Sequence, residues 1–254
     1  MPTHLYMCTQ RVTVGHFLRT HMSNLKHITF TGVDSKTDIS ALQALQKEFP
    51  LAEFGVLISY KWFENGNRYP DPAFIRELRG SGLNLALHIC GSASKDAALG
   101  NWGSIDVHLG GCLDIFKRIQ LNVSRRTDLK KVSTALYSWQ EVIIQQKGYD
   151  DVDLFYNTID YYDSDKGFSV LLDASGGRGI DTKINVLDSG YKTGYAGGFG
   201  PENIEEKLGY LLPHPDVHDF WVDMENRVRT KDWFDLEKIE QVLQKAYKLT
   251  QFNP

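Results

Sequence analysis

Eight short β-forming runs follow one another along this 254-residue chain, and stretches with helical spacing separate them. The runs are His27–Gly32, Phe54–Ser59, Leu83–Cys90, Arg118–Ser124, Glu141–Gln145, Phe168–Asp173, Thr193–Gly197 and Asp219–Asp223. No long linker interrupts the alternation, which favours parallel β/α units over two separate domains. Eight units and about 250 residues are typical of one closed barrel. The sequence therefore predicts an α/β protein whose residues 26–254 form a single (β/α)8 TIM barrel.

Three stretches have the spacing of helices that would cover such a barrel. The first, Asp38–Leu45, has apolar residues at positions 39, 42 and 45. The second, Ala73–Arg79, ends at a Gly-Ser-Gly sequence, which stops a helix. The last, Asp235–Leu249, places an apolar stripe on one face, consisting of Leu236, Ile239, Val242, Leu243 and Ala246.

Composition excludes several classes of protein. The 28 Lys and Arg against 32 Asp and Glu give a net charge of −4, and no long basic run offers the patch that nucleic-acid binding requires. The longest apolar stretches, such as Leu83–Leu87, are too short to cross a bilayer. Three irregularly spaced cysteines argue against a disulfide framework and for a reducing compartment. We expect a cytoplasmic monomer or homodimer that binds a small molecule and neither nucleic acid nor a membrane.

The first 25 residues stand apart from the barrel pattern. The stretch Met1–Val33 contains no acidic residue but carries Arg11, Arg19 and Lys26, a composition shared with organelle transit peptides. The alternatives are that Met22 is the true start or that the segment is a frayed arm. We expect residues 1–25 to be a poorly ordered N-terminal extension.

Alternation along the strands predicts which side chains point into the barrel. In the third run, Leu85, Leu87 and Ile89 share one face and would pack against the outer helices. The opposite, polar face then points inward, and its last member lies at the carboxyl end of the strand, where barrel enzymes place their chemistry. The set at this mouth is Thr31, Ser59, Cys90 with His88 behind it, Asn122, Gln145, Asp173 and Asp223.

Two glycine-rich segments follow the sixth and seventh strands. They are 173–179, with the sequence DASGGRG, and 196–203, with the sequence AGGFGPEN, which opens a helix. Glycine lets backbone N–H groups approach an anion closely, and a helix N-terminus adds partial positive charge. Loops of this kind late in a barrel predict a phosphate site.

These segments resemble motifs of the phosphoribosylanthranilate isomerase family of tryptophan biosynthesis, over about residues 27–254. The strand end at Asp173 with its Gly-Gly-x-Gly loop is similar to the family's LLD…GGxG. The second glycine segment resembles its AGG(L)xPEN phosphate loop, and the chain ending from Val222 resembles VDVSSGVE…KD. Two shorter matches are Arg68-Tyr69, which is similar to RY or RF after the second strand, and Gln120-Leu121-Asn122, which is similar to QLH.

The resemblance implies an Amadori rearrangement of a small phosphorylated sugar, with no cofactor and no metal. A general acid opens the ribose ring and a general base removes the C2′ proton. Asp173 would take the acid role and Arg68 would hold the anthranilate carboxylate. The remaining substrate contacts would come from His88, Gln120, Asn122 and Asp223. The phosphate would be held by Gly176, Gly177, Gly179, Gly197 and Gly198, helped by Arg227 or Arg229.

The sequence departs from the family at the base. The family's first strand ends in Ile-Cys-Gly, but this chain has Phe30-Thr31-Gly32, and a threonine hydroxyl has no thiolate-like form near neutral pH. The alternatives are Cys90, two strands and about 10 Å from Thr31, and Asp34 just past the first strand. In addition, Glu225-Asn226-Arg227 replaces the family's SSG and puts a carboxylate near the expected phosphate.

Two other functions remain open at this stage. The barrel could have kept its binding mouth without the base, as a phosphometabolite-binding protein without isomerase activity. The pairs His88-x-Cys90 and His108-x-x-x-Cys112 are candidate zinc ligands, but their spacing matches no common zinc motif, so we expect core histidines and no metal.

Overall fold

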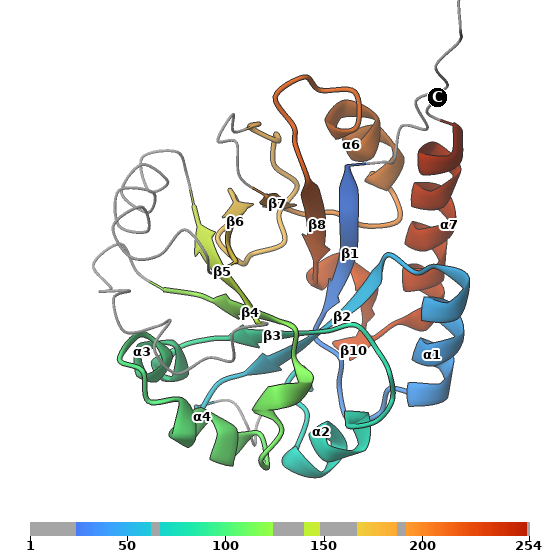
Figure 1. Ribbon diagram of the computed structural model, residues 1–254. Coiled ribbons are helices and arrows are strands. Elements are labelled where there is room, and N and C mark those ends of the chain that lie inside the picture. The colour runs from blue at the N-terminus through green and yellow to red at the C-terminus, as the bar shows by residue number, and fades with distance from the viewer. Residues whose placement is uncertain (1–23, 62–66, 124–139, 148–166, 187–191, 253–254) are drawn as a thin grey trace, which may run out of the picture.

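The chain folds as a closed barrel of eight parallel strands (Figure 1). The computed structural model describes residues 24–61, 67–123, 140–147, 167–186 and 192–252. Each strand pairs with its neighbours in chain order, and β8 returns to pair with β1. The strands are β1 (Leu25–Thr31), β2 (Ala52–Ile58), β3 (Leu85–Ile89), β4 (Arg118–Leu121), β5 (Glu141–Gln146), β6 (Phe168–Asp173), β7 (Thr193–Ala196) and β8 (Phe220–Met224). The predicted α/β TIM barrel is confirmed.

Helices lie outside this ring of strands (Figure 1). The described ones are α1 (Ile39–Glu48), α2 (Pro72–Leu78), α3 (Ser92–Ala98), α4 (Trp102–His108), α6 (Ile204–Leu211) and α7 (Leu236–Phe252). Two of them begin at aspartate caps. Asp38 caps α1 and accepts from the amides of Ser40 and Ala41. Asp71 directly precedes Pro72, caps α2 and accepts from the amide of Phe74. Such caps satisfy N–H groups that have no partner within the helix. All three predicted helices are confirmed, whereas α3 and α4 carried no periodicity long enough to predict.

The barrel begins one residue earlier than the expected boundary. Leu25 is buried and pairs with Phe220 of β8, and the side chain of Asn24 donates to the carbonyl of Val217 at 2.8 Å. The remainder of the expected N-terminal extension, residues 1–23, lies outside the described residues. Within the described part of the chain, no helix is both long and apolar enough to span a membrane.

The inside and outside of the barrel follow the predicted alternation. Leu85, Leu87 and Ile89 of β3 are buried in the main core, together with apolar residues of the surrounding helices. A separate small cluster of Ile143, Leu171 and Trp221 comes from β5, β6 and β8 and lies in the barrel interior. Inward-facing residues beyond this cluster are therefore free to be polar at both ends of the barrel.

The amino end of the barrel is closed by a buried ion-pair cluster that sequence reasoning missed. Arg118 of β4 pairs with Glu53 of β2 at 2.6 Å and with Glu141 of β5 at 3.1 Å, and Lys192 pairs with Glu141 at 2.7 Å. The Arg118 guanidinium also lies 4.3 Å from the centroid of the Trp221 ring. Burial opposes ionisation of Glu141, yet Arg118 and Lys192 hold its pKa at about 2. The cluster thus ties β2, β4 and β5 together by charge.

A short hairpin follows β8 and borders the mouth. Its strands are β9 (Arg229–Thr230) and β10 (Trp233–Phe234). The two residues between them, Lys231 and Asp232, have φ angles of 50° and 62°. Left-handed backbone at both central positions is the conformation that two-residue hairpins require. The turn directs Asp232 toward the loop after β2.

Candidate active site at the mouth of the barrel

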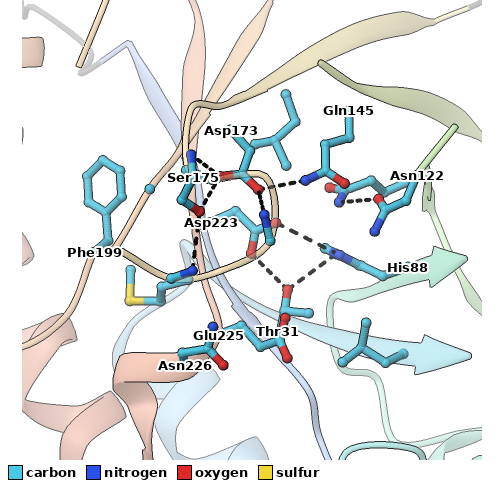
Figure 2. A pocket seen from close by; sticks show the side chains of 18 of the residues that line it. Thr31, His88, Asn122, Gln145, Asp173, Ser175, Phe199, Asp223, Glu225 and Asn226 are labelled. Atoms are coloured by element: carbon cyan, nitrogen blue, oxygen red, sulfur yellow. Dashed lines mark hydrogen bonds and ion pairs between the residues drawn. The ribbon is translucent and has the colours of Figure 1, made fainter. Parts of the chain in front are cut away.

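A cavity of about 280 Å³ opens at the carboxyl ends of the strands. Most of the predicted site residues line it, and Figure 2 shows several of their side chains converging there. These are Thr31, Arg68, His88, Cys90, Gln120, Asn122, Gln145, Asp173, Gly177, Gly179, Gly197, Gly198, Asp223 and Arg227. The structure therefore brings these side chains together around one cavity, at the end of the barrel where loops from different strands meet.

Four predicted residues do not line the cavity. Ser59 and Gly176 are absent from its wall, and so is Asp34, the second candidate base. Asp34 is 1% exposed, and its carboxylate is held by Arg229 at 3.3 Å and by the Phe234 amide at 2.7 Å. The prediction erred because proximity in sequence to β1 does not fix direction, and Asp34 turns toward the hairpin after β8. Arg229 forms an ion pair with Asp34 and does not line the cavity either.

Asp173, at the end of β6, is an acceptor for four donors. The amide and hydroxyl of Ser175 both donate to Oδ1, at 3.0 and 2.7 Å. Oδ2 accepts from the Gln145 side chain at 2.6 Å and from the amide of Gly177 (Figure 2). All four groups donate, so the carboxylate is placed as an acceptor. This is the arrangement of a base or an anionic stabiliser rather than of a proton donor.

Asp223, at the end of β8, has a different environment. Thr31 donates to its Oδ1 at 2.8 Å, and Nδ1 of His88 lies 3.9 Å from its Oδ2 (Figure 2). Burial raises the pKa of the Asp223 carboxyl to about 8, although the Thr31 hydrogen bond opposes the shift. Burial also lowers the pKa of His88 to about 4. At neutral pH Asp223 is therefore protonated and His88 is neutral, so their contact is not an ion pair.

Cys90, the first candidate base, lines the cavity as a protonated thiol. Burial raises its pKa to about 12, and the nearby Glu225 acts in the same direction. The Asn122 side chain donates to its sulfur at 3.2 Å, which only partly opposes the shift. A thiol in this state contains very little thiolate at neutral pH.

Gln120 lines the cavity and carries a side-chain acceptor that has no partner among the described residues. Its Nε2 donates to Asn122 Oδ1 at 3.2 Å, while its Oε1 is buried and has no hydrogen-bond partner among the described residues. A buried polar atom without a partner costs about 1–3 kcal/mol. Because Gln120 lines the cavity, a ligand hydroxyl or amine would remove that cost.

Arg68 follows β2 and is held by the segment after β8. Its Nη1 donates to Glu225 and, at 2.7 Å, to Asn226. Its Nε donates to Asp232 of the hairpin at 2.7 Å. The predicted carboxylate-binding residue is thus already paired with two carboxylates of its own chain.

The two glycine loops differ in how their amides are used. In the first loop, the amide of Gly177 donates to Asp173 and that of Gly179 donates to the Ser175 hydroxyl at 3.2 Å. In the second, the amides of Gly198 and Phe199 have no hydrogen-bond partner among the described residues. The N–H groups open to an anion are therefore those of the second loop, beside the start of α6.

Sequence reasoning missed several residues of the cavity wall. Tyr69, Ser175, Phe199 and Met224 contribute to it without a role predicted for them, and Glu225 and Asn226, which the sequence placed near the expected phosphate, line it as well. Ser175 could have been inferred, because serine two residues after an aspartate commonly donates to it in a turn. As for the zinc candidates, the described residues contain no group of three or more His, Cys, Asp or Glu able to hold a metal ion.

Fold and site together define a (β/α)8-barrel protein with two buried carboxylates in a polar cavity at its mouth. No family model and no curated protein matches the sequence. Among solved structures, the fold is similar to phosphoribosylanthranilate isomerase from Pyrococcus furiosus, with 18% identity, a TM-score of 0.53 and coverage of 87% of this chain and 98% of that one.

Two further structures are similar at low identity. A phosphoribosylanthranilate isomerase in complex with reduced 1-(o-carboxyphenylamino)-1-deoxyribulose 5-phosphate has 16% identity and a TM-score of 0.56, over 88% of this chain and 100% of that one. A putative spore coat polysaccharide biosynthesis protein E from Chromobacterium violaceum has 10% identity and a TM-score of 0.55, over 90% and 76%. At these identities the similarity establishes the fold, which is like that of the isomerases, and leaves the reaction to the site itself.

Proposed function

We propose that this barrel is an isomerase of a small phosphorylated sugar and that it works by proton transfer between two carboxyl groups. One observation carries the proposal: Asp173 and Asp223 line the same cavity in different environments. Four donors point at the oxygens of Asp173, which is thus placed as an acceptor, whereas Asp223 is buried with a single donor, Thr31, and burial raises its pKa to about 8. Two carboxyl groups in such different environments can divide the base and acid roles between them.

The pair supports an Amadori-type rearrangement of an aminoaldose. Asp223 would donate its proton to the ring oxygen as the C1–O bond breaks, which gives an iminium ion. Asp173 would then remove the C2 proton, and the electron pair left behind forms the C1–C2 double bond of an enol. Ketonisation of that enol gives the aminoketose: Asp173 delivers its proton to C1 and Asp223 takes the proton of the C2 hydroxyl, so both carboxyl groups regain their starting states.

These roles differ from those the family resemblance implies for this sequence. The resemblance gives Asp173 the acid role and leaves the base unassigned. The donors around Asp173 support the base role, and the proton on Asp223 supports the acid role. Thr31 would act as a positioning residue, because its hydroxyl occupies Asp223 Oδ1 and leaves the proton on Oδ2.

The substrate class follows from the rest of the wall. The Gly198 and Phe199 amides, next to the start of α6 and to Arg227, are suited to a phosphate group. Gln120 Oε1 is suited to accept from a sugar hydroxyl. A phosphorylated, hydroxyl-rich molecule fits both features.

The proposal is tested by proton exchange in D₂O. Phosphorylated aldoses and aminoaldoses would first be screened by thermal shift, and those that bind would be followed by NMR for loss of the C2 proton and for deuterium at C1 of the ketose product. We expect exchange with the wild type, and loss of exchange but retained binding with Asp173→Asn. Asp216→Asn, at an exposed carboxylate, is the control and should exchange normally. Failure of every phosphosugar to bind would refute the proposal.

A binding protein without turnover is the second candidate, and Thr31 favours it because no thiol stands at the end of β1. The same experiment separates the two functions. Binding without deuterium incorporation, and equal affinity in wild type and Asp173→Asn, would establish a phosphometabolite-binding protein.

A further inference from the structure

The guanidinium of Arg68 is largely occupied by acceptors of its own chain. Nε donates its single hydrogen to Asp232, and Nη1 donates one hydrogen bond to Glu225 and one to Asn226. Arginine has five N–H donors, one on Nε and two on each Nη. Three are thus in use, and the two on Nη2 are the ones left for a ligand among the contacts of the described residues.

This pattern prevents a ligand carboxylate from binding Arg68 with two parallel hydrogen bonds. Such a pair forms along an edge of the guanidinium, using either both Nη atoms or Nε with one Nη. Each edge that includes Nη2 already has its other donor in use, by Glu225 on one side and Asp232 on the other. An incoming carboxylate would gain single hydrogen bonds and would lie against two negative charges.

Glu225 is not easily displaced from this position. Its side chain is 25% exposed and lines the cavity beside Arg68. The neighbouring Asn226 is uncharged, and its Oδ1 accepts from the same Nη1 of Arg68. Two consecutive residues after β8 therefore hold this guanidinium group. Moving Glu225 aside would separate a partly buried ion pair, and such a separation is costly.

We infer that Glu225 fills the anion-binding edge of Arg68 and thereby makes the cavity select phosphorylated sugars that carry no carboxylate on the Arg68 side. The inference rests on the proposed function and specifies its substrate class. Glu225 is a specificity-determining residue in this view, and the chain's own carboxylate stands where a ligand carboxylate would bind.

Two ligands that differ only in the carboxylate test it. One is reduced 1-(o-carboxyphenylamino)-1-deoxyribulose 5-phosphate, and the other is its phenylamino analogue without the carboxylate. Binding of both to the wild type and to Glu225→Gln would be measured by titration calorimetry. Glu48→Gln, at an exposed glutamate that ends α1, is the matched control.

We expect the wild type and Glu48→Gln to bind the phenylamino analogue about tenfold more tightly than the carboxylated ligand, as one charge-assisted hydrogen bond is worth about that factor. Glu225→Gln keeps the side-chain shape and removes the charge, so it should bind the carboxylated ligand about tenfold better and leave the analogue within about twofold. Asp232→Asn removes the charge at the other edge of the Arg68 guanidinium and should also improve binding of the carboxylated ligand relative to the analogue. This variant replaces Glu225→Gln in the test if Glu225→Gln does not fold.

The outcomes separate this inference from the proposed function. Equal wild-type affinity for both ligands, or preference for the carboxylated one, would overturn the inference and leave phosphosugar binding intact. Unchanged selectivity in both folded variants would also overturn it. Binding of neither ligand, together with no binding in the phosphosugar screen, would overturn both proposals.

Discussion

The hydroxyl of Thr31 donates to Oδ1 of Asp223 at 2.8 Å, and this bond joins the first strand of the barrel to the last. It spans 192 positions of sequence. The bond holds in place the carboxyl group of Asp223, whose pKa burial raises to about 8. A side chain of β1 thus positions a carboxyl group of β8.

The raised pKa of Asp223 predicts a specific pH dependence of stability. In the unfolded chain this carboxyl has a pKa near 3.9, and in the folded protein about 8. Between these values the folded state binds more protons, so its stability contribution is full below about pH 4 and is lost as the pH rises through about 8. Asp223→Asn should remove this dependence.

Urea unfolding at pH 5 and pH 8.5 measures the effect. The free energy of unfolding should fall more in the wild type than in Asp223→Asn, by at least about 1 kcal/mol. The control Asp216→Asn should fall as the wild type does. Parallel pH dependence in wild type and Asp223→Asn would show that the carboxyl ionises normally.

Cys90 is expected to be dispensable for proton transfer. Its thiol has a pKa of about 12 and accepts a hydrogen bond from Asn122, so Cys90→Ser replaces one neutral polar group with another. Deuterium incorporation from D₂O should stay within about threefold of the wild type, since no charged group is lost. A loss of about a hundredfold or more, with binding retained, would restore Cys90 as the base.

The two glycine loops are expected to respond differently to alanine. Gly198 and Gly177 both have positive φ, 71° and 82°, so alanine strains the backbone equally at each. A Cβ at Gly198 would lie 2.6 Å from the Asp181 amide nitrogen, whereas at Gly177 nothing lies within 4 Å. Gly198→Ala should weaken phosphosugar binding about tenfold or more by shifting the free amides, and Gly177→Ala should weaken it less. Equal losses in calorimetry would contradict a phosphate site at the second loop.

The charged cluster at the amino end predicts a large stability cost on removing its cation. Arg118→Met leaves Glu53 and Glu141 buried without their shared partner, which should cost about 3–5 kcal/mol in the free energy of unfolding. Arg79→Met, which breaks an exposed pair with Asp114, is the control and should cost a small fraction of that. Similar unfolding midpoints for the two variants would mean that the cluster is not a stabilising element.

Much of the barrel could be predicted because its signals are local. Alternation within β3 fixes which side chains face inward, and the carboxyl end of each strand then gives the mouth. Asp173 and Asp223 were found in this way, as inward residues at strand ends. The raised pKa of Asp223 and the donors around Asp173 could not be predicted, because they depend on burial and on residues such as Gln145 that come from other strands.

What the sequence did not predict has one physical cause: the direction in which a side chain points is set by partners far away along the chain. Asp34 follows β1 directly but turns to Arg229, 195 residues away. Arg68 was correctly placed at the mouth, yet its partners Glu225 and Asp232 lie more than 150 residues further along the chain. Neither contact has any local pattern, and both are made after the chain has closed into a ring.

The ion-pair cluster at the amino end has a consequence for changing this protein. Because Arg118, Glu53 and Glu141 brace the strands at the end opposite the cavity, the support of the barrel and its chemistry share no side chain. Residues such as Thr31 and Glu225 can therefore be exchanged while the brace stays intact. That separation makes the chain a suitable scaffold for laboratory selection of new activities, in which the mouth is randomised and the braced end is left untouched.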